Sequence, residues 1–231
     1  MLRNPKHGLR DATLVSVLAY AGLRPSEALA LAYEHIRERT ILIEQKWVNG
    51  KILAGQKTIR PPRFLPLLGV LRADLHDYGL ACGHAHGLIF AQADGAPWHD
   101  HGWRDWRERV WQPACEAVGL ASITNTTIVK DGKRRARRTY EGAVPYDLRH
   151  SFASLLIHEN KYSIMQIAEW MGHSPFTLLN HYAHVIGDTT GKSTQPSERA
   201  IKLARETAMP HTTNNSTAGN GHPIVAHWRY A

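Results

Sequence analysis

The sequence predicts a mixed α+β fold that is mainly helical and contains one small three-stranded antiparallel sheet. Two observations predict this class. Apolar residues recur at helical spacing on both sides of residues 40–66, and within 40–66 short β-branched runs alternate with turn signals. The expected order along the chain is therefore helices, then the sheet, then helices again.

The first predicted helices lie near the amino terminus. Residues 11–20, DATLVSVLAY, are apolar with a helical pattern, which breaks at Gly22 and restarts at Pro25, a typical first helical residue. Arg24 stands at this restart. A permanent positive charge is thus expected at a helix start, where the backbone amides already carry partial positive charge.

The predicted sheet follows over residues 40–66. Asn49-Gly50 and Ala54-Gly55 separate its apolar runs, and such dipeptides favour tight hairpin turns. Lys57 lies in this region, so the sheet is expected to present a lysine near a turn.

The rest of the chain is predicted to be helical, apart from a basic segment and a tail. The run KDGKRRARR within residues 121–143 is expected either to be a solvated loop around an Asp131-Gly132 turn or to lie over a nucleic-acid backbone. Residues 208–222 have the composition of a disordered tail. The expected helices cover 67–78, 103–120 with an interruption near Pro113, a stretch from Pro145, 163–171 closed by Gly172, a stretch from Pro175, and 197–207.

Charge and length limit the classes of function. The chain has 231 residues, a net charge of +8 and a pI near 9.7, which favours a nucleic-acid partner over an acidic small-molecule site. A basic protein without a polyanionic partner is the alternative. One folded domain over residues 1–187 is expected, followed by a carboxyl-terminal segment, 188–231, with a helix and a flexible tail.

Secretion, membrane insertion and a metal centre are not indicated. The first residues lack an apolar signal core, and no apolar run approaches the roughly 20 residues that cross a bilayer, so a cytoplasmic protein without a membrane partner is expected. The spacing of the candidate zinc ligands matches no familiar finger, so a metal site is not expected. Those candidates are Cys82, His84, His86, His99 and His101.

Four stretches place a phosphate-compatible or nucleophilic side chain at a turn or helix end. Each has an ordinary alternative when taken alone: the arginines as ion-pair partners, the lysine as a solvated hairpin residue, the tyrosine as a half-buried aromatic. The stretches are GLRPSEALAL with Arg24, GQKTIRPPRFLPL with Lys57, PYDLRHSFAS with Arg149, and MGHSPFTLLNHYAHV with His173 and Tyr182.

Together these stretches resemble the catalytic domain of the tyrosine recombinases, the phage-integrase family, in order, spacing and local sequence over about residues 10–187. Arg24 follows Gly-Leu and precedes Ser-Glu and a leucine run, as in that family. Lys57 precedes an arginine by six residues, and Tyr182 follows His173 by nine. The resemblance implies the tyrosine-recombinase catalytic-domain fold.

The resemblance also implies an activity, the cleavage and rejoining of double-stranded DNA by a topoisomerase-IB-like transesterification without a cofactor. Tyr182 would be the nucleophile that forms a 3′-phosphotyrosine. Arg24 and Arg149 would hold the nonbridging phosphate oxygens, where charge grows in the transition state. Lys57 would be the general acid, and His173 would hydrogen-bond the phosphate.

Tyr146 departs from the commonest family pattern, which has histidine three residues before the second arginine. Histidine exchanges protons near its unperturbed pKa of about 6.5, whereas tyrosine, at about 10, mainly donates a hydrogen bond. The hypothesis is that Tyr146 contacts the phosphate and that His173 or water shares in activating Tyr182. The neighbouring His150 is expected to be structural, its ring packed in the helix and bonded to backbone, with a role in supporting the site residues as the alternative.

Two further expectations come from the resemblance. Relatives usually carry a helical core-binding domain before the catalytic one, and this sequence is expected to lack it. Family members act as tetramers on paired DNA sites, by lodging a carboxyl-terminal segment in a neighbour, and residues 197–207 are the candidate; without DNA the chain could be a monomer. They work in the cytoplasm, on the nucleoid. The alternative is a catalytically silent DNA-binding module.

Overall fold

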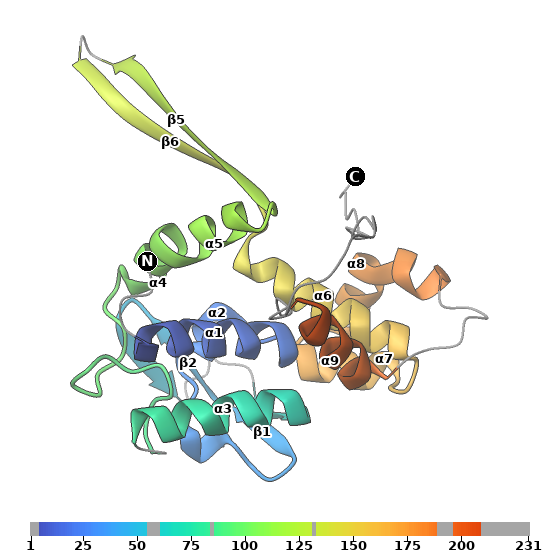
Figure 1. The fold of residues 1–231 in the computed structure, drawn as a ribbon. Coiled ribbons are helices and arrows are strands. Elements are labelled where there is room, and N and C mark those ends of the chain that lie inside the picture. The colour runs from blue at the N-terminus through green and yellow to red at the C-terminus, as the bar shows by residue number, and fades with distance from the viewer. Residues whose placement is uncertain (1–4, 55–60, 84–85, 131–132, 189–195, 209–231) are drawn as a thin grey trace, which may run out of the picture.

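The structure is a computed structural model that describes residues 5–54, 61–83, 86–130, 133–188 and 196–208 (Figure 1). It is mainly helical, as predicted. The helices are α1 (Pro5–Tyr20), α2 (Pro25–Ala28), α3 (Gly69–Cys82), α4 (Gly102–Trp106), α5 (Gln112–Ala117), α6 (Pro145–Glu159), α7 (Ile164–Met171), α8 (Pro175–Asp188) and α9 (Ser197–Ala208). The strands are β1 (Thr40–Ile43), β2 (Gln45–Val48), β3 (Lys51–Ala54), β4 (Arg63–Pro66), β5 (Ala121–Lys130) and β6 (Lys133–Gly142).

The region 40–66 forms two separate two-stranded ladders, so the prediction of one three-stranded sheet is wrong for the described residues. β1 pairs with β4, and β2 pairs with β3, both antiparallel. Strand pairing changes at Glu44, between β1 and β2. β2 does not continue the β1–β4 ladder, because Trp47 Nε1 on β2 donates to the carbonyl of Trp98 at 2.7 Å. The predicted Asn49-Gly50 turn is confirmed, with φ of 46° and 81°, the two positive values of a type I′ hairpin turn.

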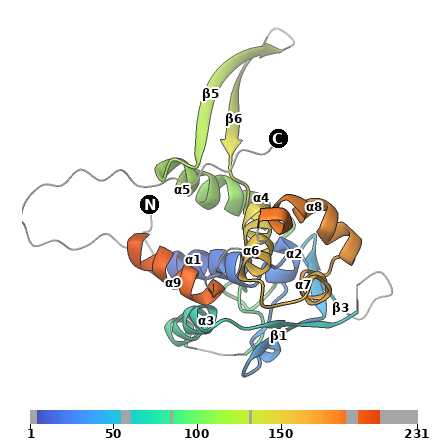
Figure 2. The same ribbon diagram turned by 90° about the vertical axis from the view of Figure 1, so that its right-hand side faces the viewer.

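Residues 121–142 form a long antiparallel hairpin, β5–β6, where the sequence predicted a loop. The strands pair from Ala121 opposite Gly142 to Lys130 opposite Lys133. Figures 1 and 2 show this hairpin projecting away from the helical body. The expected turn at residues 131–132 lies outside the described residues. Strand 121–130 is rich in threonine, isoleucine and valine, which suit an extended backbone.

Buried apolar side chains form two clusters. One joins α1, α2, β1, β4 and α3 and includes Leu14, Leu18 and Ile41. The other joins α6, α7 and α8 and includes Phe152, Ile167 and Leu178. α1 packs on α6, so the two clusters meet along these two helices.

The helix expected over 103–120 is interrupted, as predicted near Pro113. α4 runs into a π-helical turn at Arg107–Trp111, and α5 follows with the proline in its first turn. Proline cannot donate a backbone hydrogen bond, so a wider turn before it relieves the helix.

The carboxyl-terminal stretch expected to be helical, 197–207, lies within α9, which packs on α3 and α6. The expected disordered tail, 208–222, lies almost wholly outside the described residues. Among the helices that the structure describes, none is both long enough and apolar enough to cross a membrane.

Candidate active site

Arg149 lies in the first turns of α6, and its guanidinium is buried between the two apolar clusters. The helix begins at Pro145, and Asp147 accepts a hydrogen bond from the amide of Val144 at 2.8 Å, which caps the helix. The side chain of Arg149 is only 1% exposed. The sequence pattern predicted this helix start and this charge, and the structure places both.

Backbone carbonyls hold the Arg149 guanidinium. Nη1 donates to the carbonyl of Gly22 at 2.5 Å, and Nη2 donates to the carbonyl of Met171. Nη2 also lies 3.1 Å from Nε2 of His173. Nε is buried and has no hydrogen-bond partner among the described residues. None of the ion pairs that the described residues form includes Arg149, so its positive charge remains available to an anion.

Burial and the nearby charge of Arg24 lower the pKa of Arg149 to about 10, although Glu27 acts in the opposite direction. Even so, the side chain keeps its proton at neutral pH. Burial and Arg24 thus destabilise the positive charge of Arg149, and a negative group bound beside it would stabilise that charge.

Arg24 and Arg63 share one carboxylate, that of Glu27. Arg24 Nη1 lies 3.0 Å from Glu27 Oε1, and Arg63 Nη2 lies 2.7 Å from Oε2. Oε2 also accepts from the backbone amide of Arg24 at 3.0 Å, so the carboxylate caps α2. Burial would raise the pKa of Glu27, but the hydrogen bond and charge of Arg63 and the charge of Arg24 hold it below its ordinary value.

The turn after α7 brings His173 to the arginines. Gly172 ends α7 with φ of 57°, and its carbonyl accepts from Arg24 Nη2 at 3.1 Å. The carbonyl of Trp170 accepts from Arg63 Nε at 2.9 Å. A side chain at position 172 would be strained by this φ and would approach the guanidinium of Arg63 to 3.2 Å.

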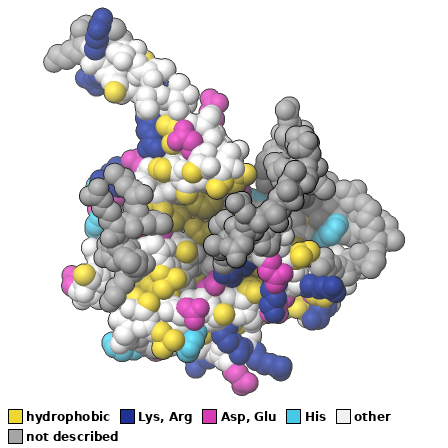
Figure 3. Space-filling model, viewed as in Figure 1, with side chains coloured by type: hydrophobic (Ala, Val, Ile, Leu, Met, Phe, Trp, Pro, Cys, Tyr) yellow, Lys and Arg dark blue, Asp and Glu magenta, His cyan; other side chains and the backbone are white. Residues whose placement is uncertain are grey.

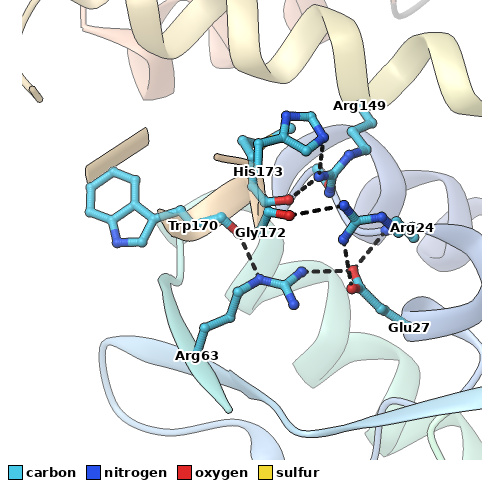
Figure 4. A network of polar contacts seen from close by, with 9 residues as sticks. Arg24, Glu27, Arg63, Arg149, Trp170, Gly172 and His173 are labelled. Atoms are coloured by element: carbon cyan, nitrogen blue, oxygen red, sulfur yellow. Dashed lines mark hydrogen bonds and ion pairs between the residues drawn. The ribbon is translucent and has the colours of Figure 1, made fainter. Parts of the chain in front are cut away.

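Figure 4 shows the resulting network, in which Arg24, Arg63 and Arg149 converge on the end of α7 and the turn after it, and Arg24 and Arg63 share the carboxylate of Glu27. Three cations face a single anion, Glu27, so the cluster has an excess of positive charge. Guanidinium groups bind phosphate oxygens well, because their N–H groups match the geometry of two oxygens. The arrangement can hold a phosphate.

Tyr182 contacts His150, the residue after Arg149 in the chain. Its hydroxyl lies 2.7 Å from Nδ1 of His150, and its side chain is only 3% exposed. The expectation that the His150 ring is bonded to backbone is therefore wrong. α8 is not regular at Tyr182, where φ is −122° and ψ is 16°. The tyrosine sits at a kink and points into the protein.

Tyr146 packs against the same histidine. The two rings meet edge to face with centroids 5.1 Å apart, and Tyr146 is 38% exposed. Burial lowers the pKa of His150, with Asp147 opposing this and His181 and Arg149 adding to it. The imidazole is therefore neutral at neutral pH, and its Nδ1 can accept a hydrogen bond.

The structure thus brings together Arg24, Arg149 and His173, and it places Tyr182 in contact with His150. Lys57 lies outside the described residues. Sequence reasoning missed three parts of the site: Glu27, Arg63 and the contact of His150 with Tyr182. Glu27 had a signal, since a glutamate three residues into a helix start commonly caps it.

No group of three histidine, cysteine, aspartate or glutamate side chains gathers closely enough to bind a metal within the part of the chain that the structure describes. His84, one of the five zinc candidates, lies outside that part.

Comparison with known proteins gives consistent matches. The model of the phage integrase family matches residues 1–187. Tyrosine recombinase XerC of Herpetosiphon aurantiacus is 27% identical over 197 residues, which are 83% of this chain and 53% of that protein. XerC of Bradyrhizobium diazoefficiens is 30% identical over 76% of this chain and 46% of its own. The chain spans about half the length of these relatives.

Solved structures show the same fold. The XerH site-specific recombinase, bound to its palindromic difH substrate after cleavage, matches 87% of this chain and 46% of its own with a TM-score of 0.51 and 21% identity. The Tn1549 transposon integrase bound to transposon right-end DNA matches 90% and 62%, with a TM-score of 0.52 and 16% identity.

Proposed function

Because this chain belongs to the phage integrase family, we propose that it is the catalytic part of a site-specific DNA recombinase that cuts and rejoins double-stranded DNA. The observation that carries the proposal is the buried, carbonyl-held guanidinium of Arg149 beside Arg24 and His173. Such a cluster suits the phosphate of a DNA backbone, and Tyr182 contacts His150, the residue after Arg149.

The arginines bind the scissile phosphate in this proposal. Arg149 and Arg24 donate to its nonbridging oxygens, on which negative charge increases as a fifth oxygen joins phosphorus. His173 supplies a further hydrogen bond. Arg63 and Glu27 do not touch DNA; they hold Arg24 at the right place and keep the positive charge near the phosphate.

Tyr182 is the nucleophile. Its oxygen attacks phosphorus, the bond from phosphorus to the 5′ oxygen breaks, and a 3′-phosphotyrosine forms. The tyrosine proton passes to Nδ1 of neutral His150, which is already at hydrogen-bond distance. The leaving 5′ oxygen takes a proton from Lys57. Tyr146 orients the His150 ring and, as the sequence pattern suggested, contacts the phosphate. Attack by a second 5′-hydroxyl reverses the chemistry and rejoins a strand.

The nucleophile must move before it reacts, since its side chain is buried. The irregular backbone at Tyr182 marks the point where α8 bends. In the proposed cycle, DNA binding moves this part of α8, and the hydroxyl passes its proton to His150 as it leaves this contact and reaches the phosphate. Transfer of strands between two duplexes requires four active sites, so the working form is a tetramer on paired sites in the bacterial cytoplasm. α9 is the segment that passes to a neighbour.

Trapping the covalent intermediate tests the proposal. The probe is a pool of nicked duplexes with a randomised centre, in which the short strand beside the nick diffuses away after cleavage. The wild-type chain should form a denaturation-resistant protein–DNA adduct, and Tyr182→Phe should form none, because phenylalanine has no oxygen to attack. Tyr162→Phe is the matched control, because this ring packs on the indole of Trp170, a residue that joins the network only through its backbone carbonyl, and it should retain the adduct.

The alternative function is a DNA-binding module without strand cleavage. It predicts that the wild-type chain binds the same duplexes and yields no adduct from any member of the pool. An adduct that persists in Tyr182→Phe would reject Tyr182 as the nucleophile and leave the activity itself intact.

A further inference from the structure

The two strands β5 (121–130) and β6 (133–142) are together called the arm below, and they stand outside the body of the molecule (Figures 1 and 2). Its two strands pair mainly with each other, and its base packs on α5. Trp111 Nε1 donates to the carbonyl of Ala143 at 2.8 Å, and the amide of Ile123 donates to Glu116 Oε1 at 3.2 Å. The base is anchored, whereas the rest extends into solvent.

Neither face of the arm forms an apolar surface. Residues opposite each other in an antiparallel pair share a face. One face carries Ile123, Asn125 and Thr127 opposite Tyr140, Arg138 and Ala136, and the other carries Thr124, Thr126 and Ile128 opposite Thr139, Arg137 and Arg135. A two-stranded ribbon of this kind is only marginally stable in water, so the arm contributes little to the core. Its value to the protein lies in contact with a partner.

The arm concentrates positive charge. Six lysines and arginines and two acidic residues fall within 121–142, which is half of the net charge of +8. Arg134, Arg135 and Arg137 are exposed, and none of them takes part in the ion pairs that the described residues form. Basic side chains stand out along the arm in Figure 3. The partner is therefore a polyanion.

The arginines alternate between the two faces of the ribbon. Arg134 and Arg138 lie on one face, and Arg135 and Arg137 lie on the other. A flat acidic protein surface would meet one face only. A groove of duplex DNA has phosphates along both walls, and its major groove, about 12 Å wide, admits a two-stranded β-ribbon.

We propose that the arm enters a groove of double-stranded DNA and contacts the phosphates of both strands without reading the sequence. At about 3.3 Å per residue, its ten-residue strands reach about 30 Å, nearly one turn of the duplex. The DNA contact stands on the charge and geometry of the arm. Only its position beside a cleavage site rests on the proposed function.

Salt-dependent binding tests the inference. All proteins are full-length chains carrying Tyr182→Phe, so that no strand is cut, and the probe is a labelled 30-base-pair duplex of arbitrary sequence. The arm variant combines Arg134→Ala, Arg135→Ala and Arg137→Ala. The control combines Arg37→Ala, Arg39→Ala and Arg199→Ala, exposed residues outside the arm, and removes the same charge. Fluorescence anisotropy gives the Kd at several salt concentrations.

The slope of log K against log salt should become shallower by about 2 to 3 in the arm variant, because each lost phosphate contact removes about 0.9. At about 0.1 M salt its affinity should fall at least about tenfold. The control should change the slope by less than about 1. Equal slopes for the arm variant and the control would overturn the inference, provided that both melt at the wild-type temperature.

A second probe separates DNA from an acidic protein partner. Polyglutamate binding that falls in the arm variant, with duplex binding unchanged, would assign the arm to acidic proteins and overturn the DNA proposal. The binding experiment does not depend on catalysis. If the chain forms a Tyr182 adduct but the arm variant keeps the wild-type salt slope, only the proposal that the arm contacts DNA is rejected. If the arm variant loses slope but no adduct forms, only the proposal of strand cleavage is rejected.

Discussion

A single carboxylate, that of Glu27, holds two guanidinium groups of the site in place. It is 9% exposed and contacts both Arg24 and Arg63. We expect Glu27→Gln to lower the free energy of unfolding by about 3 kcal/mol, because removing one charge of a buried cluster leaves the others uncompensated. Urea unfolding measures this change in the free energy of unfolding. Glu169→Gln, an exposed carboxylate on α7, is the control and should change stability by less than about 0.5 kcal/mol.

The same carboxylate predicts an acid dependence. The pKa of Glu27 is lower in the folded chain than in the unfolded one, where it is about 4.3. Its stabilising contribution is therefore complete above about pH 5 and is lost as the pH falls through the folded pKa. The stability difference between wild type and Glu27→Gln should shrink between pH 6 and pH 3. A difference that stays constant over this range would mean that the charge of Glu27 is not what stabilises the fold.

His150 is predicted to take the proton of Tyr182. His150→Phe should reduce the rate of adduct formation by about 10² to 10⁴, the usual contribution of a general base, with duplex affinity unchanged. Burial lowers the pKa of His150 below its ordinary value of about 6.5, so the wild-type rate should hold at neutral pH and fall in acid as Nδ1 takes a proton.

The pH profile separates this chemical role from a purely structural one. His150→Gln should be slow and should lack the acidic fall in rate. His181→Gln is the control, because this exposed histidine lies one residue before Tyr182 and its Nδ1 faces the carbonyl of Thr177 at 2.7 Å. It should keep the rate at neutral pH, and its acidic fall should remain but move to higher pH, because His181 helps to lower the pKa of His150. A His150→Gln chain with the wild-type profile would remove His150 from the chemistry.

At the scale of elements, α9 is held on its own chain by few contacts. Arg205 makes two hydrogen bonds with Asp74, at 3.0 and 2.9 Å, and its guanidinium lies over the ring of Tyr20. Ile201 is the buried apolar anchor. The buried Ser197 also donates to the carbonyl of Leu155 and to Glu159 on α6. The ion pair and the cation–π contact of Arg205 are modest in free energy, so we expect α9 to detach more readily than the helices of the two apolar clusters.

Removing the Arg205 contacts should therefore loosen α9 alone. In Arg205→Ala, amide hydrogen exchange over 198–207 should become several-fold faster, while the melting temperature of the rest of the chain stays within about 2 °C. Lys202→Ala, which breaks only the pair with Glu198 within the helix, is the control. Unchanged exchange in Arg205→Ala would show that the apolar contact at Ile201 suffices.

At the scale of the whole molecule, the meeting of Arg24, Arg149 and His173 was predictable from sequence. Each stands in a short motif whose turn or helix start fixes the local backbone, and the motifs occur in a familiar order. The ion pair between Arg63 and Glu27 was not predictable, because it depends on how close β4 lies to α2 in the folded chain. The sequence around each residue does not determine the distance between these two elements.

The β5–β6 arm and the strands of residues 40–66 show a different limit of prediction from sequence. Charge dominated the interpretation of KDGKRRARR, although the β-branched residues before it and the Asp-Gly pair within it favour a hairpin. The three-stranded sheet was wrong because β2 follows the Trp47 contact with Trp98, which joins residues 51 positions apart. Pairing of strands is decided by such distant contacts and only secondarily by propensity.

The carbonyls that hold Arg149 come from Gly22 and Met171, at nearly opposite ends of the folded chain. A growing or partly unfolded chain has no such pair of carbonyls at one place, so it has no pocket for a phosphate. Under the proposed function, completion of the fold must therefore precede the chemistry, and an incompletely synthesised chain would be unable to cleave DNA.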